Sequence, residues 1–275
     1  MLDEEAPGGY REIASAVPGA VLWWSVAGTA PGETRVLPDG CVDLLWTGTQ
    51  LAVAGPDVVA FTTSTPPGSL VAGVRFAPGT GPRAFGLRAD EAVGRRVPLD
   101  DLLLARRVGR WDDEIRAAPA GSSPPSALVP DTAAGLERVA RALADAAPDP
   151  DGLVLALVAA IRAGQGVGQA ARTLGVSERT LHRRALPALG YGPATLGRVL
   201  RLQRAVALAR SGVPWADVAA RSGFADQAHL ARDVRALAGV SPTTLVPSAR
   251  TSQDCAPGDQ ANRSTGLPSG SRTVA

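Results

Sequence analysis

The sequence contains no lysine, and all 28 of its basic residues are arginine. Cysteine and histidine are equally scarce, with two residues of each: Cys41, Cys255, His182 and His229. Two cysteines so far apart provide neither a disulfide framework nor a cysteine-rich zinc site. Metal-dependent barrel enzymes and Ser-His-Asp hydrolases both need imidazole groups, yet the first 181 residues contain none. We therefore expect no metal, no cofactor and no catalytic residue, and hence a protein that is not an enzyme.

Long apolar runs are also missing. The longest plain one, residues 153–161, is well short of the roughly 20 residues that cross a bilayer. The N-terminal stretch "MLDEEAPGG" is acidic, whereas a secretory signal is basic and then apolar. The sequence therefore predicts a cytoplasmic protein that does not contact a membrane.

Charge is nearly balanced over the whole chain but is divided unequally along it. Residues 1–150 contain 13 arginines and 19 acidic residues, a net charge of −6, whereas residues 151–249 contain 12 arginines and 5 acidic residues, a net charge of +7. A basic half joined to an acidic half indicates a module that binds a polyanion such as double-stranded DNA. The alternative is an ordinary solvated basic surface.

A short pattern occurs twice between residues 166 and 245. It consists of a small residue, a glycine and a leucine, and the second copy lies 48 or 49 positions after the first: Ala171, Gly175 and Leu181, then Ala219, Gly223 and Leu230. A small residue allows two helices to cross closely, and glycine accepts the positive φ of a tight turn. Ser177 and Asp226 follow the two turns as natural helix N-caps. The pattern predicts two helix-turn-helix units.

Between the units, residues 193–211 are expected to form one linker helix of about 27 Å. Its apolar side contains Leu196, Val199, Leu202, Val206 and Ala209, and its other side contains Arg201 and Arg204. The second helix of each unit is also two-sided. The sides predicted to face outward contain Arg179, His182, Arg183 and Leu186 in the first unit, and Ala228, Ala231, Arg232 and Arg235 in the second.

At these residues the chain resembles the AraC/XylS family of bacterial transcription regulators, whose DNA-binding domain consists of two helix-turn-helix units joined by a long helix. The run "GFADQAHLARDVRALAGVSPTTL", residues 223–245, is similar to the family signature, as is "LGVSERTLHRRALPALGYGP", residues 174–193. The chain has Ala185 and Val234 where the family usually has phenylalanine. Pro187 is expected to cut the first recognition helix short.

The resemblance implies a sequence-specific regulator that binds double-stranded DNA. The contacting positions that it implies are Arg179, His182, Arg183, Gln227, Ala228, His229, Arg232 and Arg235. It also implies a nucleoid-associated location, with a small-molecule effector, RNA polymerase and a second copy of the chain as candidate partners. The alternative is a DNA-binding interaction or architectural protein that senses nothing.

Residues 20–76 contain short β-branched or aromatic runs divided by glycine, proline and aspartate, which favour an antiparallel sheet or barrel. In the resembling family a cupin-like sensor often lies here. Helices are expected at residues 83–87, 99–105, 132–146 and 152–161. The predicted fold is thus α+β: a β-rich sensor or interaction domain at 1–130, a helical domain at 131–247 with its DNA-binding core at 164–247, and a disordered tail at 248–275.

Three residues of the first domain are candidates for ligand binding. Trp23 and Trp46 could stack on a ligand, and Arg75 could hold an acidic one. The alternatives are that the tryptophans belong to the core and that Arg75 forms a structural ion pair. Cys41 is either a redox sensor or a small buried residue.

Overall fold

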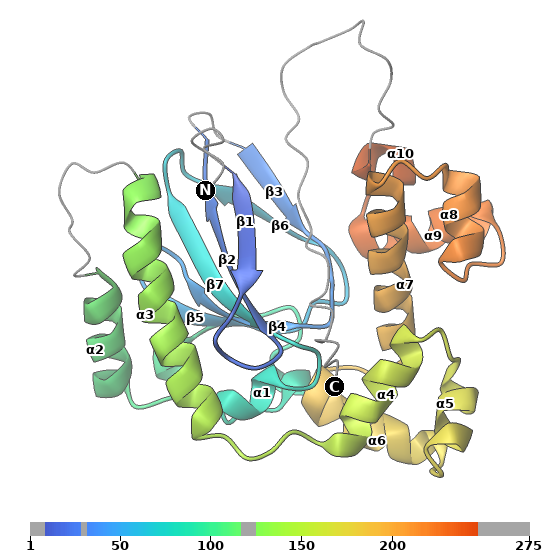
Figure 1. Cartoon of the computed structure of the whole chain (residues 1–275), viewed down its shortest axis with the longest axis horizontal. Coiled ribbons are helices and arrows are strands. Elements are labelled where there is room, and N and C mark those ends of the chain that lie inside the picture. Colours follow the sequence, from blue (N-terminus) through green and yellow to red (C-terminus); the bar gives the residue numbers. More distant parts are fainter. Residues whose placement is uncertain (1–8, 29–31, 117–124, 247–275) are drawn as a thin grey trace, which may run out of the picture.

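The computed structural model describes residues 9–28, 32–116 and 125–246. The predicted tail at 248–275, with Cys255, lies outside these residues. In Figure 1 the strands and the helices α1 to α3 lie on one side, and the helices α4 to α10 lie on the other. Within the described part of the chain, no helix is both long and apolar enough to cross a membrane.

The strands form an antiparallel arrangement, as the sequence predicts. A six-stranded sheet has the order β1 (Tyr10–Ala14), β2 (Ala20–Val26), β7 (Leu70–Phe76), β4 (Val42–Trp46), β5 (Leu51–Ala54) and β8 (Arg96–Pro98). A separate pair consists of β3 (Gly32–Val36) and β6 (Phe61–Thr65). Every pairing is antiparallel. The strand runs that the sequence predicts at residues 20–26, 34–37, 41–46, 51–55 and 69–76 are confirmed as β2, β3, β4, β5 and β7, and β1, β6 and β8 are additions to them.

One face of the large sheet is covered by α3 (Pro125–Asp145), which packs across β2, β7 and β4 (Figure 1). Side chains from that face and from α3 form a single core, which contains Leu22, Leu44, Val74, Leu136, Val139, Ala140 and Leu143. This helix therefore belongs to the sheet, and α2 (Ala105–Arg116) packs beside it.

The limits predicted for helices at residues 83–87 and 99–105 are wrong. The first is the single turn α1 (Gly81–Ala84). The second is only a 3₁₀ turn, η2 (Leu99–Asp101), and the next helix, α2, begins at Ala105. Leu99 is fully buried and Leu102 and Leu103 pack against the same core, whereas Leu104 is 66% exposed.

The second half of the chain is helical. Its elements are α4 (Gly152–Arg162), α5 (Val167–Thr173), α6 (Glu178–Leu189), α7 (Pro193–Arg210), α8 (Trp215–Arg221), α9 (Gln227–Ala238) and α10 (Pro242–Leu245). The single linker helix is confirmed as α7, with 18 residues. Leu196 and Val199 on its first half pack with α4, α5 and α6. Leu202 and Val206 on its second half pack with α8, α9 and α10. Each helix-turn-helix unit therefore has its own core, and α7 belongs to both.

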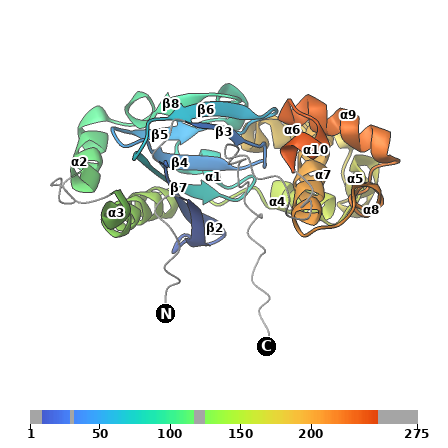
Figure 2. The same cartoon turned by 90° about the horizontal axis from the view of Figure 1, so that it is seen from above.

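The strand region contacts both units directly, and Figure 2 shows it beside them from above. Leu37, just after β3, is buried in the core of the second unit. Next to it, the buried Gln203 side chain on α7 donates from Nε2 to the Pro38 carbonyl oxygen at 2.7 Å. The linker helix is therefore attached to the strand region as well as to its own units.

Candidate nucleic-acid interface

The first unit consists of α5, a turn and α6. Gly175 in the turn has a φ of 67°, as the sequence predicts, and Ser177 caps α6 by accepting a hydrogen bond on Oγ from the Thr180 amide at 3.1 Å. On the inner side of α6, Leu181 and Ala185 are fully buried. The outer side consists of exposed Arg179, His182 and Arg183 and half-buried Leu186, which line one shallow depression. This face can receive a polyanion.

The expectation that Pro187 shortens α6 is wrong. The helix continues through Pro187 to Leu189 and ends at Gly190 in the left-handed conformation, with a φ of 81°. Pro187 removes one hydrogen bond of the helix, the one to the Arg183 carbonyl oxygen, but α6 continues for two residues beyond it. As a result α6 and α9 both have 12 residues.

The second unit repeats the arrangement with α8 and α9. Gly223 in the turn has a φ of 80°, and Asp226 caps α9 by accepting a hydrogen bond from the His229 amide at 2.6 Å. The buried residues of α9 are Leu230, Val234, Leu237 and Ala238. The exposed residues expected to contact DNA are Gln227, Ala228, Arg232 and Arg235. Ala185 and Val234, at the positions where the family usually has phenylalanine, are both fully buried in the cores.

His229 differs from the other candidates because its ring points toward the protein. It packs edge-on against Phe224, with ring centroids 5.3 Å apart, and Nδ1 accepts a hydrogen bond from the Ala225 amide at 3.4 Å. Asp233 lies one turn further along α9, with 3.9 Å between His229 Nε2 and Asp233 Oδ2. These contacts give His229 a structural role in the second unit.

Asp233 itself connects α9 to the linker helix. Arg198 Nη2 on α7 lies 3.0 Å from Asp233 Oδ1, and Arg201 Nη2 lies 3.8 Å from Asp233 Oδ2. The guanidinium of Arg201 also lies over the Phe224 ring, 5.6 Å from its centroid. Sequence reasoning placed Arg201 on the outer side of the linker and assigned no role to Asp233, because an ion pair between two helices leaves no periodic signal in either.

His182 of the first unit is exposed but is also restrained. A Cβ added to Gly192 would lie 2.6 Å from His182 Cδ2, so the imidazole ring lies directly on the backbone at the start of α7. The ring is therefore held at the edge of the outer face of α6. Arg179 and Arg183 flank it in the sequence, and both are exposed.

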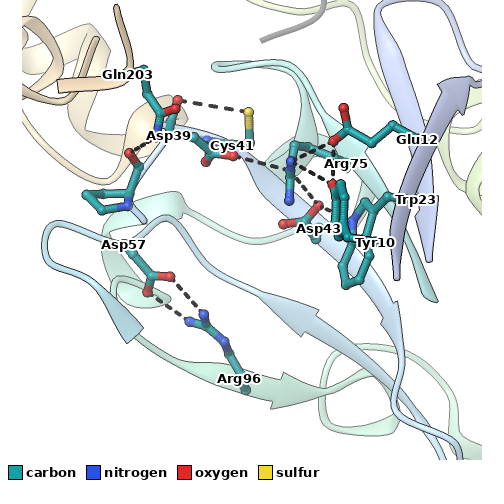
Figure 3. A network of polar contacts seen from close by, with 11 residues as sticks. Tyr10, Glu12, Trp23, Asp39, Cys41, Asp43, Asp57, Arg75, Arg96 and Gln203 are labelled. Atoms are coloured by element: carbon teal, nitrogen blue, oxygen red, sulfur yellow. Dashed lines mark hydrogen bonds and ion pairs between the residues drawn. The ribbon is translucent and has the colours of Figure 1, made fainter. Parts of the chain in front are cut away.

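A second polar centre lies on the sheet, on the face opposite α3 (Figure 3). Arg75 on β7 is buried, and 3.2 Å separates its guanidinium nitrogens from a carboxylate oxygen of each of three residues, Glu12, Asp39 and Asp43. Trp23 donates from Nε1 to Asp43 Oδ1 at 3.0 Å and stacks on Tyr10. Burial raises the pKa of Asp43 to about 6, although the Arg75 guanidinium opposes that rise.

The three residues proposed from the sequence for ligand binding are only partly brought together. Trp23 and Arg75 share this centre, and the guanidinium lies 5.8 Å from the Trp23 ring centroid. Trp46 is opposite Ala72 in the strand register, whereas Trp23 is opposite Gly73, so the two tryptophans lie on opposite faces of the sheet. Grouping Trp46 with the other two is therefore wrong: it is buried in the core under α3. Arg75, with its three carboxylate partners, fits the alternative of a structural ion pair.

Cys41 lies beside this centre and is buried as a free thiol. Its pKa is raised well above the ordinary value, first by burial and then by the charge of Asp39. A protonated, buried thiol is a poor nucleophile. The geometry thus fits the small-apolar-residue alternative for Cys41.

Two family models match parts of the chain. Residues 170–246 match a family described as "Helix-turn-helix domain", and residues 20–98 match one described as "Domain of unknown function (DUF6597)". No curated protein sequence matches the chain.

The chain is also similar to solved structures of ToxT from Vibrio cholerae. An apo form of a ToxT variant is 10% identical, with a TM-score of 0.45, over 85% of this chain and 98% of that one. A form of wild-type ToxT with a bound unsaturated fatty acid is 10% identical, with a TM-score of 0.41, over 89% and 97% of the two chains.

The helix-turn-helix match covers both units, from α5 to α10. Within it, the capped turns, the continuous linker helix and two equal recognition helices with basic outer faces occur together with the signature runs of the sequence. The chain therefore carries a helix-turn-helix DNA-binding domain at residues 170–246, and this domain resembles that of the AraC/XylS transcription regulators.

Proposed function

We propose that α6 and α9 read the bases of two successive major-groove segments on one face of DNA, about 10 bp apart. The proposed contacts are made by Arg179, His182, Arg183, Gln227, Ala228, Arg232 and Arg235, with His229 supporting the second group. One observation carries the proposal: each recognition helix buries its apolar side in a core of its own and leaves its arginines exposed. Arginine pairs with guanine O6 and N7, and Gln227 at the start of α9 can pair with adenine.

The experiment that tests this proposal is selection of bound sites from random DNA, followed by footprinting and a salt titration. Two protected segments about 10 bp apart are expected. Because residues 151–249 have a net charge of +7, affinity should fall steeply with salt, with a log-log slope of about −0.9 for each phosphate neutralised. Protection of a single groove segment, or an affinity that salt leaves unchanged, would contradict the proposal.

We further propose that the strand region regulates this binding, by sensing a small molecule or by dimerisation. The candidate ligand site is the centre around Trp23 and Arg75, because it combines an aromatic pair with partly exposed carboxylates: Glu12, Asp39 and Asp43 are 23%, 18% and 15% exposed. RNA polymerase as a partner and a cytoplasmic, nucleoid-associated location belong to the same proposal. The proposed limit between the two domains lies between α3 and α4, at residues 146–151; the limits 1–130 and 131–247 expected from the sequence would cut α3, which packs on the sheet.

Titration of the full chain with candidate metabolites, followed by tryptophan fluorescence and DNA affinity, separates this role from the alternative of a non-sensing architectural protein. A sensor is expected to change its DNA affinity with one class of metabolite, and the change should be lost in Trp23→Phe. A protein whose affinity no metabolite alters, and whose oligomeric state is the same with and without DNA, fits the architectural alternative.

A further inference from the structure

One loop of the strand region contacts the ends of both recognition helices. This bridging loop, residues 55–60, connects β5 to β6. A Cβ added to Gly190, the C-cap of α6, would lie only 2.7 Å from Pro56 Cγ in the loop. Four residues later the Ala60 amide donates to the carbonyl oxygen of Leu237, in the last turn of α9, at 2.6 Å. Carbonyl oxygens in the last turn of a helix have no donor within the helix. The Ala60 amide therefore satisfies an acceptor that α9 itself leaves unpaired.

The loop also inserts a side chain toward each core. Val58 packs against the core of the first unit, and Ala60 packs against the core of the second. Four residues of extended chain span at most about 14 Å, so both contacts arise from one short element. The N-terminal ends of α6 and α9, where the capped turns and the predicted base contacts lie, are not among these contacts.

The bridging loop is itself fixed to the strand region. Asp57 accepts two hydrogen bonds from Arg96 on β8, at 2.8 and 2.7 Å, in a two-pronged ion pair (Figure 3). The Arg96 guanidinium also lies 4.1 Å from the ring centroid of Phe61, at the start of β6. Two backbone bonds complete the attachment, from the Gly55 amide to the Arg95 carbonyl at 2.9 Å and from the Gly94 amide to the Pro56 carbonyl at 3.1 Å. A two-pronged arginine–carboxylate pair restricts direction as well as distance.

From this geometry we propose that the bridging loop sets the separation and relative orientation of the two recognition helices. It thereby sets the base-pair spacing that the chain prefers between its two DNA segments. The linker helix α7 joins the two units along the chain, and the loop joins the C-terminal ends of α6 and α9 to one element of the strand region. This role rests on the proposed reading of two segments, and it gives the strand region a part in specificity that needs no ligand.

The test is the affinity of the full chain for its selected site and for versions with one base pair inserted or removed between the two segments. One inserted base pair moves the second segment by 3.4 Å and rotates it by roughly 35°. Wild type is expected to lose about tenfold or more in affinity. Arg96→Lys keeps the charge but loses the two-pronged pair. The affinity that this variant loses when the spacing changes by one base pair should therefore be only about threefold. Arg141→Lys, in an exposed pair with Asp145 on α3, is the matched control and should behave like wild type.

Val58→Ala provides a second variant, because it leaves the Asp57–Arg96 pair intact and loosens only the contact with the first unit. It should reduce the spacing preference in the same direction, even if Arg96→Lys fails to fold. The proposal is overturned if the variants retain the wild-type ratio of affinities for the different spacings, or if they weaken binding equally at every spacing. A wild type with no sequence preference at all instead contradicts the proposed reading of bases, so the two failures are distinguishable.

Discussion

Arg198 on α7 and Asp233 on α9 form an ion pair, with 3.0 Å between Arg198 Nη2 and Asp233 Oδ1. The Asp233 side chain is only 13% exposed, whereas Arg198 and Arg201, its two arginine partners, are 40% and 34% exposed. The pair fixes the second recognition helix to the linker helix from the side that faces the protein. The pair therefore stabilises the fold directly, and it affects DNA binding only through the position of α9.

We predict that Asp233→Ala lowers the free energy of unfolding by about 1 to 2 kcal/mol. Solvent around the half-exposed arginines keeps the loss below the 3 to 5 kcal/mol typical of a fully buried pair. Urea unfolding measures the change. Asp113→Ala, at an exposed site on α2, is the control and should stay within about 0.5 kcal/mol of wild type. Equal effects at the two sites would show that the pair contributes nothing.

The second prediction concerns Arg232, on the exposed side of α9. Arg232→Ala should cost about 1 to 3 kcal/mol on the selected site and relax the preference at one base position. Affinities for a panel of single-base variants of the site measure both effects. The control is Arg141→Ala on α3, because Arg201 is engaged with Phe224 and Asp233 and is unsuitable for that purpose. A uniform loss across the panel would assign Arg232 to a phosphate instead of a base.

Local patterns in the sequence predict the DNA-binding half well. Its turns need glycine at Gly175 and Gly223, its caps need a side-chain oxygen at Ser177 and Asp226, and its helices have a clear period, so each element is specified by its own residues. Pro187 is the exception, because a proline that removes one hydrogen bond does not by itself end a helix, and α6 continues to Leu189.

The strand region could be predicted only in part. Its buried strands are apolar enough to recognise, but β6 has the sequence FTTST and is largely exposed, so no apolar run marks it. The Arg75 centre joins residues from β1, β2, β4, β7 and the loop before β4, and only the register of the strands brings them together. The bridging loop escapes prediction for the same reason: its partners at the ends of α6 and α9 lie more than 130 positions later in the chain.

The third prediction concerns pH and Asp43. Burial raises the pKa of its carboxyl from 3.8 to about 6, so between these values the folded protein holds a proton that the unfolded chain has lost. The stability due to this proton is complete below about pH 4 and is lost as the pH rises to about 6. Asp43→Asn keeps an oxygen acceptor for Trp23 and has no proton to lose. The free energy of unfolding of Asp43→Asn minus that of wild type should therefore increase from pH 4 to pH 7, by at most about 3 kcal/mol.

Urea unfolding of both proteins at pH 4, 5, 6 and 7 measures this difference. The absolute stability of either protein is less informative, because other carboxylates titrate in the same range. A difference between the two that stays constant from pH 4 to pH 7 would show that Asp43 is ionised throughout.

The last prediction tests the contact between α6 and the strand region with two glycines of nearly identical backbone. Gly190 and Gly212 have φ values of 81° and 85°, so alanine is strained at either position, by about 1 to 2 kcal/mol. Their surroundings differ. A Cβ at Gly212 meets nothing within 4 Å, whereas one at Gly190 would lie 2.7 Å from both Pro56 Cγ and Val93 Cγ2. Gly190→Ala should therefore cost a further 1 to 3 kcal/mol or so, the usual range for overpacking, in urea unfolding. Equal costs at the two positions would mean that the bridging loop does not press on the end of α6 in solution.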